Sequence, residues 1–137
     1  MHLIVFIFTF LYINYNSFAY DSEDLEYFLR EGQCINCDLS NANFDGQYID
    51  KVVIVNSDLS GANFNNAKFA AVIIKSSNFS NASFVNTDMP SSSIEDSDFN
   101  NSTFENVNLI SSAAVNSNFS FAYFHKAKLY GASFKKS

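Results

Sequence analysis

Cys34 and Cys37 form a Cys-x-x-Cys pair, a spacing that serves redox thiols, zinc ligands or a disulfide. Redox pairs usually open a helix in a thioredoxin-like βαβ unit, which this sequence does not offer. A zinc site would need two further ligands, which the neighbouring residues do not supply. We therefore expect structural cysteines, and residues i and i+3 across a turn can meet disulfide geometry in an exported chain.

Two other groups could carry chemistry. His125 follows Glu105 by twenty residues, and a His–carboxylate pair can act in general acid–base catalysis, but no nucleophile accompanies it and we expect a surface ion pair. Stacked carboxylates could bind a divalent cation, but Asn alternates with Asp here and a Gly-rich calcium loop is missing, so we expect a solvated, turn-forming ladder. This ladder comprises Asp38, Asp58, Asn78, Asp98 and Asn118.

Composition narrows the class of protein. The chain has 137 residues, 8 Lys plus Arg, 14 Asp plus Glu and a net charge of −6. Apolar residues make up 47%, too many for a disordered chain. An acidic chain with few Arg residues is a poor phosphate binder, so we expect no direct nucleic-acid binding. Nothing in the composition calls for a cofactor or a metal, and we expect no catalytic residues.

The elements that position these residues follow from an internal repeat. From residue 37, five blocks of twenty align without a gap, beginning with CDLSNANFDGQYIDKVVIVN and SDLSGANFNNAKFAAVIIKS. Within each block, every fifth residue from Leu39 to Phe134 is apolar, and a small residue usually stands two places earlier. Gln47 is the clear misfit. A period of five fits neither a helix nor an ordinary alternating strand.

Two inward positions in every five residues suit a chain that turns a corner every five residues. Four corners make a square coil of twenty residues, and coils stack at the inter-strand spacing of roughly 4.8 Å. We predict an all-β solenoid of about five coils in which each coil is stabilised only by its neighbours. One interior column should be a ladder of rings, Phe44, Phe64, Phe84, Phe104 and Phe124.

The segments SDLSG, ANFNN, SNFSN and SDFNN follow the pattern small-Asn/Asp-Leu/Phe-x-x, which resembles the pentapeptide-repeat family. The resemblance covers about residues 32–137 and implies a right-handed quadrilateral β-helix. LEYFLREGQCINCDLS is similar to a common opening of such proteins, a short helix followed by Cys-x-x-Cys-Asp-Leu. The family resemblance also implies dimerisation through the C-terminal coil. Some members imitate duplex DNA and occupy the DNA site of a topoisomerase.

Three segments are expected. Residues 1–19 are predicted to be a signal peptide, because LIVFIFTFLYI is too short to span a membrane and Ser17 and Ala19 suit cleavage after Ala19. The protein would then be secreted or periplasmic, with no stable membrane span. Residues 20–31 are predicted to be a capping helix that ends at Gly32. Residues 32–137 are predicted to be the β-helix.

Charge and exposed apolar residues point to contact surfaces. Residues 106–137 hold four Lys and no acid, a net charge of +4, whereas residues 20–105 are acidic. Phe121, Tyr123 and Tyr130 should point outward, and Phe134 should lie at the exposed end of the last coil, so these four residues form the predicted interface. A second apolar patch, Val53, Val55 and Ile73, should face outward on one side.

These features favour a non-catalytic, exported scaffold or protein-interaction rod with an unknown protein partner, which could be a second copy bound through the C-terminal coil. A topoisomerase-directed DNA mimic is the alternative. It is disfavoured because residues 32–137 carry a net charge of only −2, a weak field.

Overall fold

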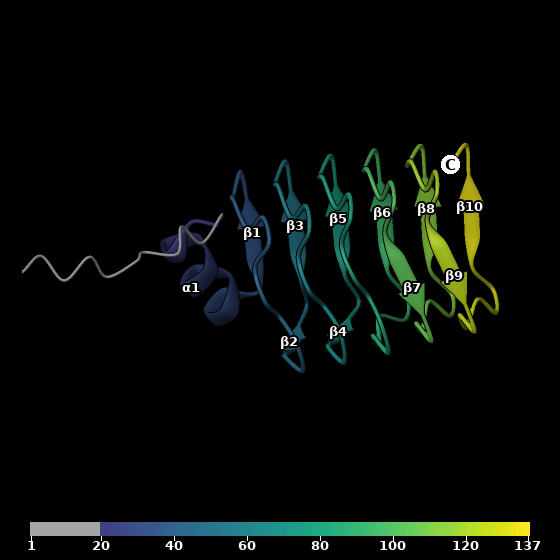
Figure 1. Ribbon diagram of the computed structural model, residues 1–137, viewed down its shortest axis with the longest axis horizontal. Helices are drawn as coiled ribbons and strands as arrows, with labels where there is room; N and C mark the ends of the chain where they lie inside the picture. Colours follow the sequence, from purple (N-terminus) through teal and green to yellow (C-terminus); the bar gives the residue numbers. More distant parts are fainter. Residues whose placement is uncertain (1–19) are drawn as a thin grey trace, which may run out of the picture.

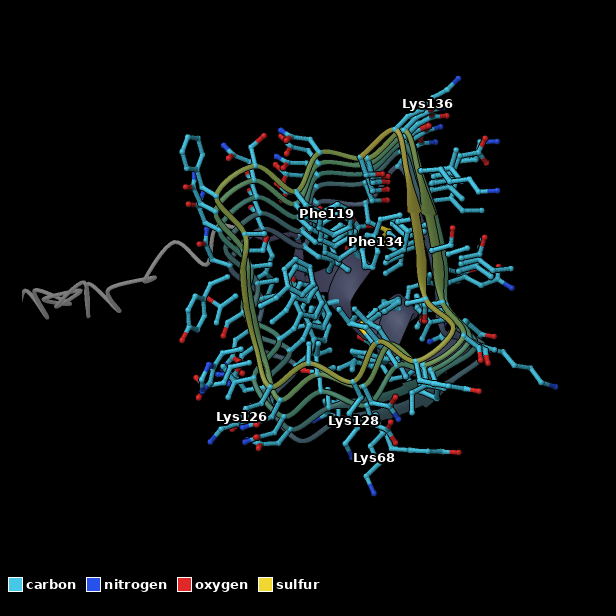
Figure 2. All side chains as sticks on the ribbon, turned by 90° about the vertical axis from the view of Figure 1, so that its right-hand side faces the viewer. Lys68, Phe119, Lys126, Lys128, Phe134 and Lys136 are labelled. Carbon is cyan, nitrogen blue, oxygen red and sulfur yellow. A yellow bond between two sulfur atoms is a disulfide. The ribbon has the colours of Figure 1, made fainter. Side chains whose placement is uncertain are left out.

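A computed structural model of the chain describes residues 20–137. The chain forms a rod of stacked four-sided coils, with one short helix at its N-terminal end (Figures 1 and 2). This parallel β-helix of about five coils confirms the fold class expected from the repeat. The predicted signal peptide, residues 1–19, lies outside the described residues. No helix within residues 20–137 is long and apolar enough to cross a membrane.

All the strands are short and pair in parallel. The largest sheet has six strands in the order β1-β3-β5-β6-β8-β10, and two further sheets pair β2 with β4 and β7 with β9. Partners in every strand pair lie twenty residues apart, as in Val53 opposite Ile73. The strands are β1 (Gln33–Ile35), β2 (Tyr48–Asp50), β3 (Val53–Val55), β4 (Lys68–Ala70), β5 (Ile73–Lys75), β6 (Ser93–Glu95), β7 (Thr103–Glu105), β8 (Ala113–Val115), β9 (Tyr123–His125) and β10 (Ser133–Lys135).

The corners of the coils explain the abundance of Asn. Every fifth residue from Asn36 to Lys136 occupies a corner and has a positive φ, between 49° and 68°. Only Gly adopts this left-handed conformation freely, and Asn and Asp tolerate it better than other residues. At one corner the Ala42 N–H donates to the Leu39 carbonyl at 3.1 Å and Asn41 occupies the position with positive φ, as in a type II turn.

The core follows the predicted apolar lattice, by which we mean every fifth residue counted from Leu39. Each lattice position from Leu39 to Ala114 is buried, and Gln47, the misfit, is exposed. Phe44, Phe64 and Phe84 stack directly over one another, with ring centroids 4.8 and 4.9 Å apart, which confirms the predicted column. Full burial of one such side chain contributes about 1.5–3 kcal/mol, and the close spacing shows that the rings leave no gap between coils.

Helix α1 (Ser22–Glu31) covers the first coil. Its N-cap is Asp21, whose Oδ1 accepts from the backbone N–H groups of Glu23 and Asp24 at 2.8 and 3.3 Å. Gly32, with φ of 69°, ends the helix. Phe28 is fully buried and meets the Phe44 ring edge-on at 5.4 Å. The helix therefore shields the N-terminal end of the Phe column.

Candidate interaction surface

The four predicted interface residues lie in the last coil and at its end. Phe121 and Tyr130 are 86% and 85% exposed, Tyr123 is 54% exposed and Phe134 is 39% exposed. Phe121 occupies a corner, and Tyr130 directly precedes the corner residue Gly131. Tyr123 points outward from β9, and Phe134 belongs to β10. We refer to these four residues, together with Lys126, Lys128, Lys135 and Lys136, as the C-terminal tip.

An apolar hollow opens at the end of the rod. It has a volume of about 360 Å³ and is lined by Phe119, Phe124, Leu129, Phe134 and Ser137. Sequence periodicity places the four apolar side chains in the core. Phe119 and Phe124 are only partly buried and Leu129 and Phe134 are 39% exposed, because no described coil covers them. Figure 2 looks onto this end and shows Phe119 and Phe134 pointing into the interior of the square.

Phe121 differs in type from the residues at the other corners of its column. Its φ is 58°, and a bulky residue with positive φ is an outlier. The equivalent corners of the preceding coils hold Asn41, Gly61, Asn81 and Asn101. The C-terminal coil therefore places an exposed aromatic ring where the rest of the column has residues that suit the backbone. Strained residues of this kind cluster at functional sites.

Two other corners of the last coil show the same change. Lys126 and Lys136 have a φ of 53°, and the corresponding corners of the coil before hold Asn106 and Asn116. Both lysines are exposed and project from the rim of the square, as does Lys128 (Figure 2). The C-terminal tip thus combines an apolar centre with a positively charged rim. Sequence periodicity alone did not single out Lys126 and Lys136; comparison of the corner columns would have found them.

The opposite end of the rod is acidic. Helix α1 carries Glu23 and Asp24 in its first turn. Near its end, Glu31 accepts a 2.8 Å hydrogen bond from Nε of Arg30, and this bond raises the pKa of Arg30 above its ordinary value. Both groups are solvent-exposed, so the pair contributes little to stability. The two ends of the rod therefore differ in the sign of their charge.

The predicted ion pair between Glu105 and His125 is absent among residues 20–137. The two residues are partners in the β7–β9 register, but the described ion pairs involve only Arg30 and Lys75. The His125 ring instead stacks on Tyr123, with centroids 5.8 Å apart and planes 13° apart. The correction has a simple cause: ring stacking and solvation compete with a weak exposed ion pair. His125 therefore belongs to the aromatic surface of the tip.

The Asp/Asn ladder forms turns, as the sequence predicted. Each member accepts a hydrogen bond from the backbone N–H two residues later; for Asp58 and Asn78 these distances are 2.9 and 3.0 Å. Asn118 also donates to Asp98 at 3.0 Å. Within residues 20–137, no three acidic, His or Cys side chains are grouped as a metal site. The full set of turn-forming residues is Asp38, Asp58, Asn78, Asp98 and Asn118.

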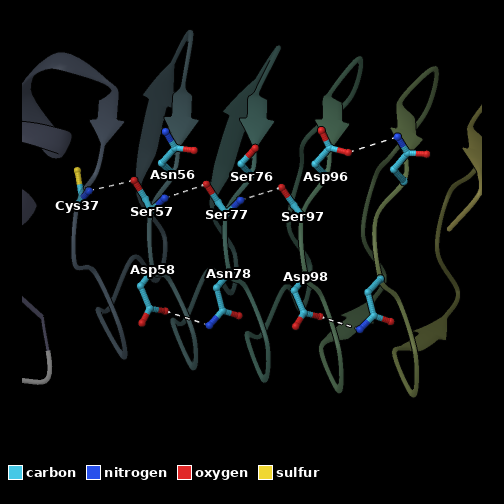
Figure 3. Close-up of a pocket in the computed structure, with 12 residues that line it drawn as sticks. Cys37, Asn56, Ser57, Asp58, Ser76, Ser77, Asn78, Asp96, Ser97 and Asp98 are labelled. Atoms are coloured by element: carbon cyan, nitrogen blue, oxygen red, sulfur yellow. Dashed lines mark hydrogen bonds between the residues drawn. The ribbon is translucent and has the colours of Figure 1, made fainter.

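A ladder of serine residues runs beside the Asp/Asn ladder, on the floor of a shallow polar groove (Figure 3). The hydroxyls of Ser57, Ser77 and Ser97 accept from the backbone N–H of the preceding coil at 3.0–3.1 Å. Each also donates to a carbonyl of its own coil. At these corners the serine hydroxyls, and not backbone carbonyls, accept from the backbone N–H groups, so the role of the serines is structural.

Both cysteines are buried at the start of the first coil, as expected. Their sulfur atoms are joined as a disulfide in the structure. The Ser57 hydroxyl lies 3.4 Å from Sγ of Cys34, and it also accepts from the backbone N–H of Cys37 at 3.0 Å. The pair thus occupies inward positions at the start of the first coil, next to the serine ladder.

A four-sided parallel β-helix with five-residue sides and left-handed corners defines a narrow class of repeat proteins. The pentapeptide-repeat family model, described as pentapeptide repeats (8 copies), matches residues 30–66, 67–106 and 102–137. The chain belongs to this family. A search of the curated proteins found no match.

Solved structures share the fold at low sequence identity. QnrB1, a plasmid-mediated fluoroquinolone resistance protein, is 22% identical with a TM-score of 0.60; the match covers 73% of this chain and 54% of QnrB1. The chain thus spans about half the length of that structure. A pentapeptide-repeat protein from the Arabidopsis thaliana thylakoid lumen is 22% identical, with a TM-score of 0.55 and coverage of 74% and 65%. Rfr23 from the cyanobacterium Cyanothece 51142 is 12% identical, with a TM-score of 0.50 and coverage of 82% and 97%.

Proposed function

We propose that the protein is a non-catalytic, exported interaction rod whose C-terminal tip binds an acidic surface of a protein partner. The observation that carries this proposal is Phe121, an aromatic residue 86% exposed at a corner with φ of 58°. Asn or Gly would suit that corner better, so its presence costs stability. A role in contact would explain an unfavourable residue at this corner.

The chemistry of the tip supports an acidic partner. Exposed aromatic residues are typical anchors of protein interfaces, and the lysine rim supplies long-range attraction to negative charge. A symmetric contact between the tips of two copies would bring two clusters of four lysines together. Charge therefore favours a different, acidic protein over a homodimer through the C-terminal coil.

The topoisomerase-directed alternative fits this surface less well. A DNA mimic needs an extended negative field, whereas residues 106–137 carry a net charge of +4. The DNA-mimic hypothesis predicts inhibition of a purified topoisomerase by the rod. The interaction-rod proposal predicts none.

The corner residues allow a test in which binding and stability move in opposite directions. The variant Phe121→Asn restores the residue type of the column, and we expect it to raise the free energy of unfolding by up to about 1 kcal/mol. The double variant Phe121→Asn, Tyr130→Ser, used as bait, should no longer capture the partner that the unaltered rod captures. Tyr48→Ser is the matched control, because Tyr48 is 68% exposed but lies in β2, away from the tip. Equal capture by all three baits would contradict the proposal.

Export is tested separately. Expression with the complete N-terminus in cells that secrete proteins should give a mature chain beginning at Tyr20, measured by mass spectrometry. Replacing Ala19 with Asp should block cleavage, because signal peptidases need a small residue at that position. A mature protein that still begins at residue 1 or 2 would contradict the proposed export.

A further inference from the structure

Six of the twelve outward side chains on the six-stranded sheet are apolar, and four of these six lie in β1, β3 and β5. Its strands contribute two outward side chains each, and Ile35 and Ile73 are 56% and 50% exposed. Val53, Val55 and Val115 are half-buried on the same face. Parallel sheets usually have both faces covered, but within residues 20–137 only the inner face is covered, by the core. An exposed apolar area of this kind marks an interaction site.

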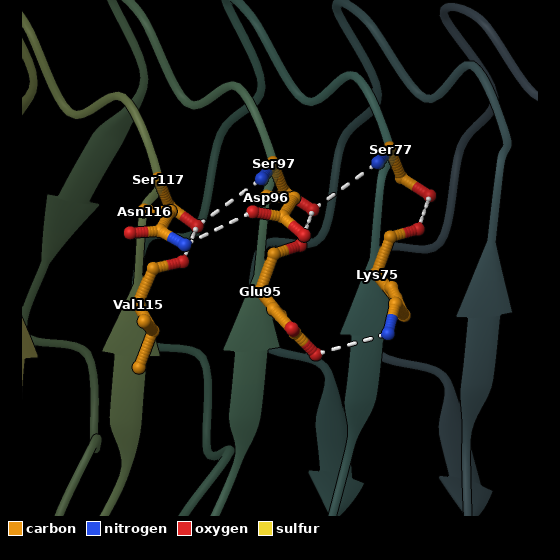
Figure 4. A network of polar contacts seen from close by, with 8 residues as sticks. All are labelled: Lys75, Ser77, Glu95, Asp96, Ser97, Val115, Asn116 and Ser117. Atoms are coloured by element: carbon orange, nitrogen blue, oxygen red, sulfur yellow. Dashed lines mark hydrogen bonds and ion pairs between the residues drawn. The ribbon is translucent and has the colours of Figure 1, made fainter.

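Three charged side chains lie on this face, Lys75 and Glu95 at its centre and Lys135 at its C-terminal edge. Lys75 in β5 and Glu95 in β6 form an ion pair at 3.2 Å, with both side chains about half exposed (Figure 4). Three strands lie on the side of Lys75, namely β1, β3 and β5, and three lie on the side of Glu95, namely β6, β8 and β10. The pair therefore straddles the midline of the sheet.

We propose that this face binds the same face of a second copy, through a two-fold axis that lies along the strands between β5 and β6. Such an axis reverses the rod and preserves the strand direction. It sets β5 over the partner's β6, β3 over the partner's β8 and β1 over the partner's β10. Lys75 then meets the partner's Glu95, and Glu95 meets the partner's Lys75, so the four charges alternate around a square.

The sizes of the side chains fit the same axis. At the first outward position of each strand, the N-terminal half carries the larger residues Gln33, Val53 and Ile73. The C-terminal half carries the smaller residues Ser93, Ala113 and Ser133. The two-fold axis places each large residue opposite a small one. Two-fold interfaces require such self-complementarity, in which i contacts j and j contacts i.

The shape of the face also suits this packing. Successive coils superimpose when viewed along the rod (Figure 2), so the sheet is flat enough to lie against another at the usual spacing of roughly 10 Å. The alternative axis, along the rod, would place Lys75 opposite the partner's Ile73 and Glu95 opposite the partner's Ser93. It would leave both charges without a partner across the interface.

Apart from Lys135, whose strand β10 lies over the partner's β1, the proposed dimer does not use the C-terminal tip. Because the rods lie antiparallel, the two tips point in opposite directions, and one dimer could join two tip-bound partners. The face is small for an interface, which places the dimer in the weak, reversible class. We therefore expect the average mass of the purified protein in sedimentation equilibrium to rise from monomer to dimer with increasing micromolar concentration.

Charge reversal provides the decisive test. Lys75→Glu places four carboxylates around the square and Glu95→Lys places four ammonium groups there, so each variant alone should dimerise at least about ten-fold more weakly. An equimolar mixture should restore the dimer, because each Glu of one chain then faces a Lys of the other. Lys68→Glu is the matched control, since Lys68 is exposed in β4 on another face. Both charged positions are exposed, so the variants should remain folded by circular dichroism.

Several results would overturn the proposal. One is a monomer at every concentration of the unaltered protein, the outcome expected if a different protein or residues 1–19 cover the face. A second is failure of the two charge variants to dimerise when mixed. A third is a dimer that resists Lys75→Glu but is lost in the Phe121→Asn, Tyr130→Ser variant, which would place the contact at the tip. That variant leaves the face intact and should dimerise normally, so failure of this proposal and failure of the proposed function are distinguishable.

Discussion

Phe84 lies at the centre of the ring column, between Phe64 and Phe104 at 4.9 and 4.8 Å. Its side chain is 1% exposed, and the backbone of stacked coils cannot collapse around a missing ring. We predict that Phe84→Ala lowers the free energy of unfolding by about 3–5 kcal/mol, measured by urea unfolding. Phe121→Ala, which removes an exposed ring, should not lower stability. Comparable losses in the free energy of unfolding of Phe84→Ala and Phe121→Ala would show that the ring column does not stabilise the core.

The serine ladder gives a second prediction at the scale of single residues. Oγ of Ser77 accepts from the buried N–H of Ser57 at 3.1 Å and donates to the Lys75 carbonyl at 2.8 Å. Ser77→Ala leaves that N–H without its partner, so the free energy of unfolding should fall by about 1–3 kcal/mol. Ser93→Ala, on the exposed outer face of β6, should be nearly neutral in the same unfolding measurement. A neutral effect at both positions would mean that water replaces the ladder.

Single residues also show where sequence reasoning stops. The apolar lattice predicted that Phe84 is buried, because a side chain's direction depends only on its place in the five-residue period. The strain at Phe121 was not predicted, since the sign of φ at a corner depends on the turn type. The stacking of His125 on Tyr123 was also missed. Register places His125 beside Glu105 but does not decide which neighbour an exposed ring prefers.

Among the elements, helix α1 has the clearest structural role, which is to cover the N-terminal end of the β-helix. Parallel coils present unpaired backbone groups and apolar side chains at each end, and these ends invite association with other chains. Phe28 covers the Phe44 ring, and Oδ2 of Asp24 accepts from the backbone N–H of Asp38 at 2.8 Å. The helix is thus attached to the first coil by both a buried ring and a polar contact.

Removal of this ring should expose the N-terminal end of the core. We predict that Phe28→Ala lowers the free energy of unfolding by about 3–5 kcal/mol and increases binding of an apolar dye to the folded protein. Tyr27→Ala is the control, because Tyr27 is 44% exposed on the same helix. If both variants bind the dye equally, the helix does not act as the cap.

The sequence predicted the cap and the coils with different signals. Gly32 predicted the end of the helix, because helix ends have local chemical requirements. The sheets follow from the twenty-residue repeat rather than from strand propensity. Periodicity treats every coil alike, however, so it placed Phe119 and Leu129 in the core. Their partial exposure depends on their place at the end of the rod, which a repeat pattern does not contain.

At the scale of the whole molecule, the rod should tolerate loss of a complete coil. Each coil contacts only its neighbours, and the columns depend only on the twenty-residue register. Deletion of residues 97–116 would bring Phe124 over Phe84 and Phe119 over Phe79, and would place Ser117 where Ser97 accepts from Ser77. We expect the shortened chain to keep its β-sheet circular dichroism and to unfold in urea at a lower concentration, because one interface between coils is lost.

A deletion of nearly the same length should have a different result. Removal of residues 97–113 shifts Phe119 and Phe124 off the apolar lattice, so the C-terminal coil can no longer bury its rings against Phe79 and Phe84. We expect this chain to lose the cooperative unfolding transition, or the part of it contributed by the last coil. Since the shorter deletion removes fewer residues, greater damage from it can only reflect broken register. Equal unfolding curves for the two deletions would contradict the stacking of columns that places the tip and the flat face on this rod.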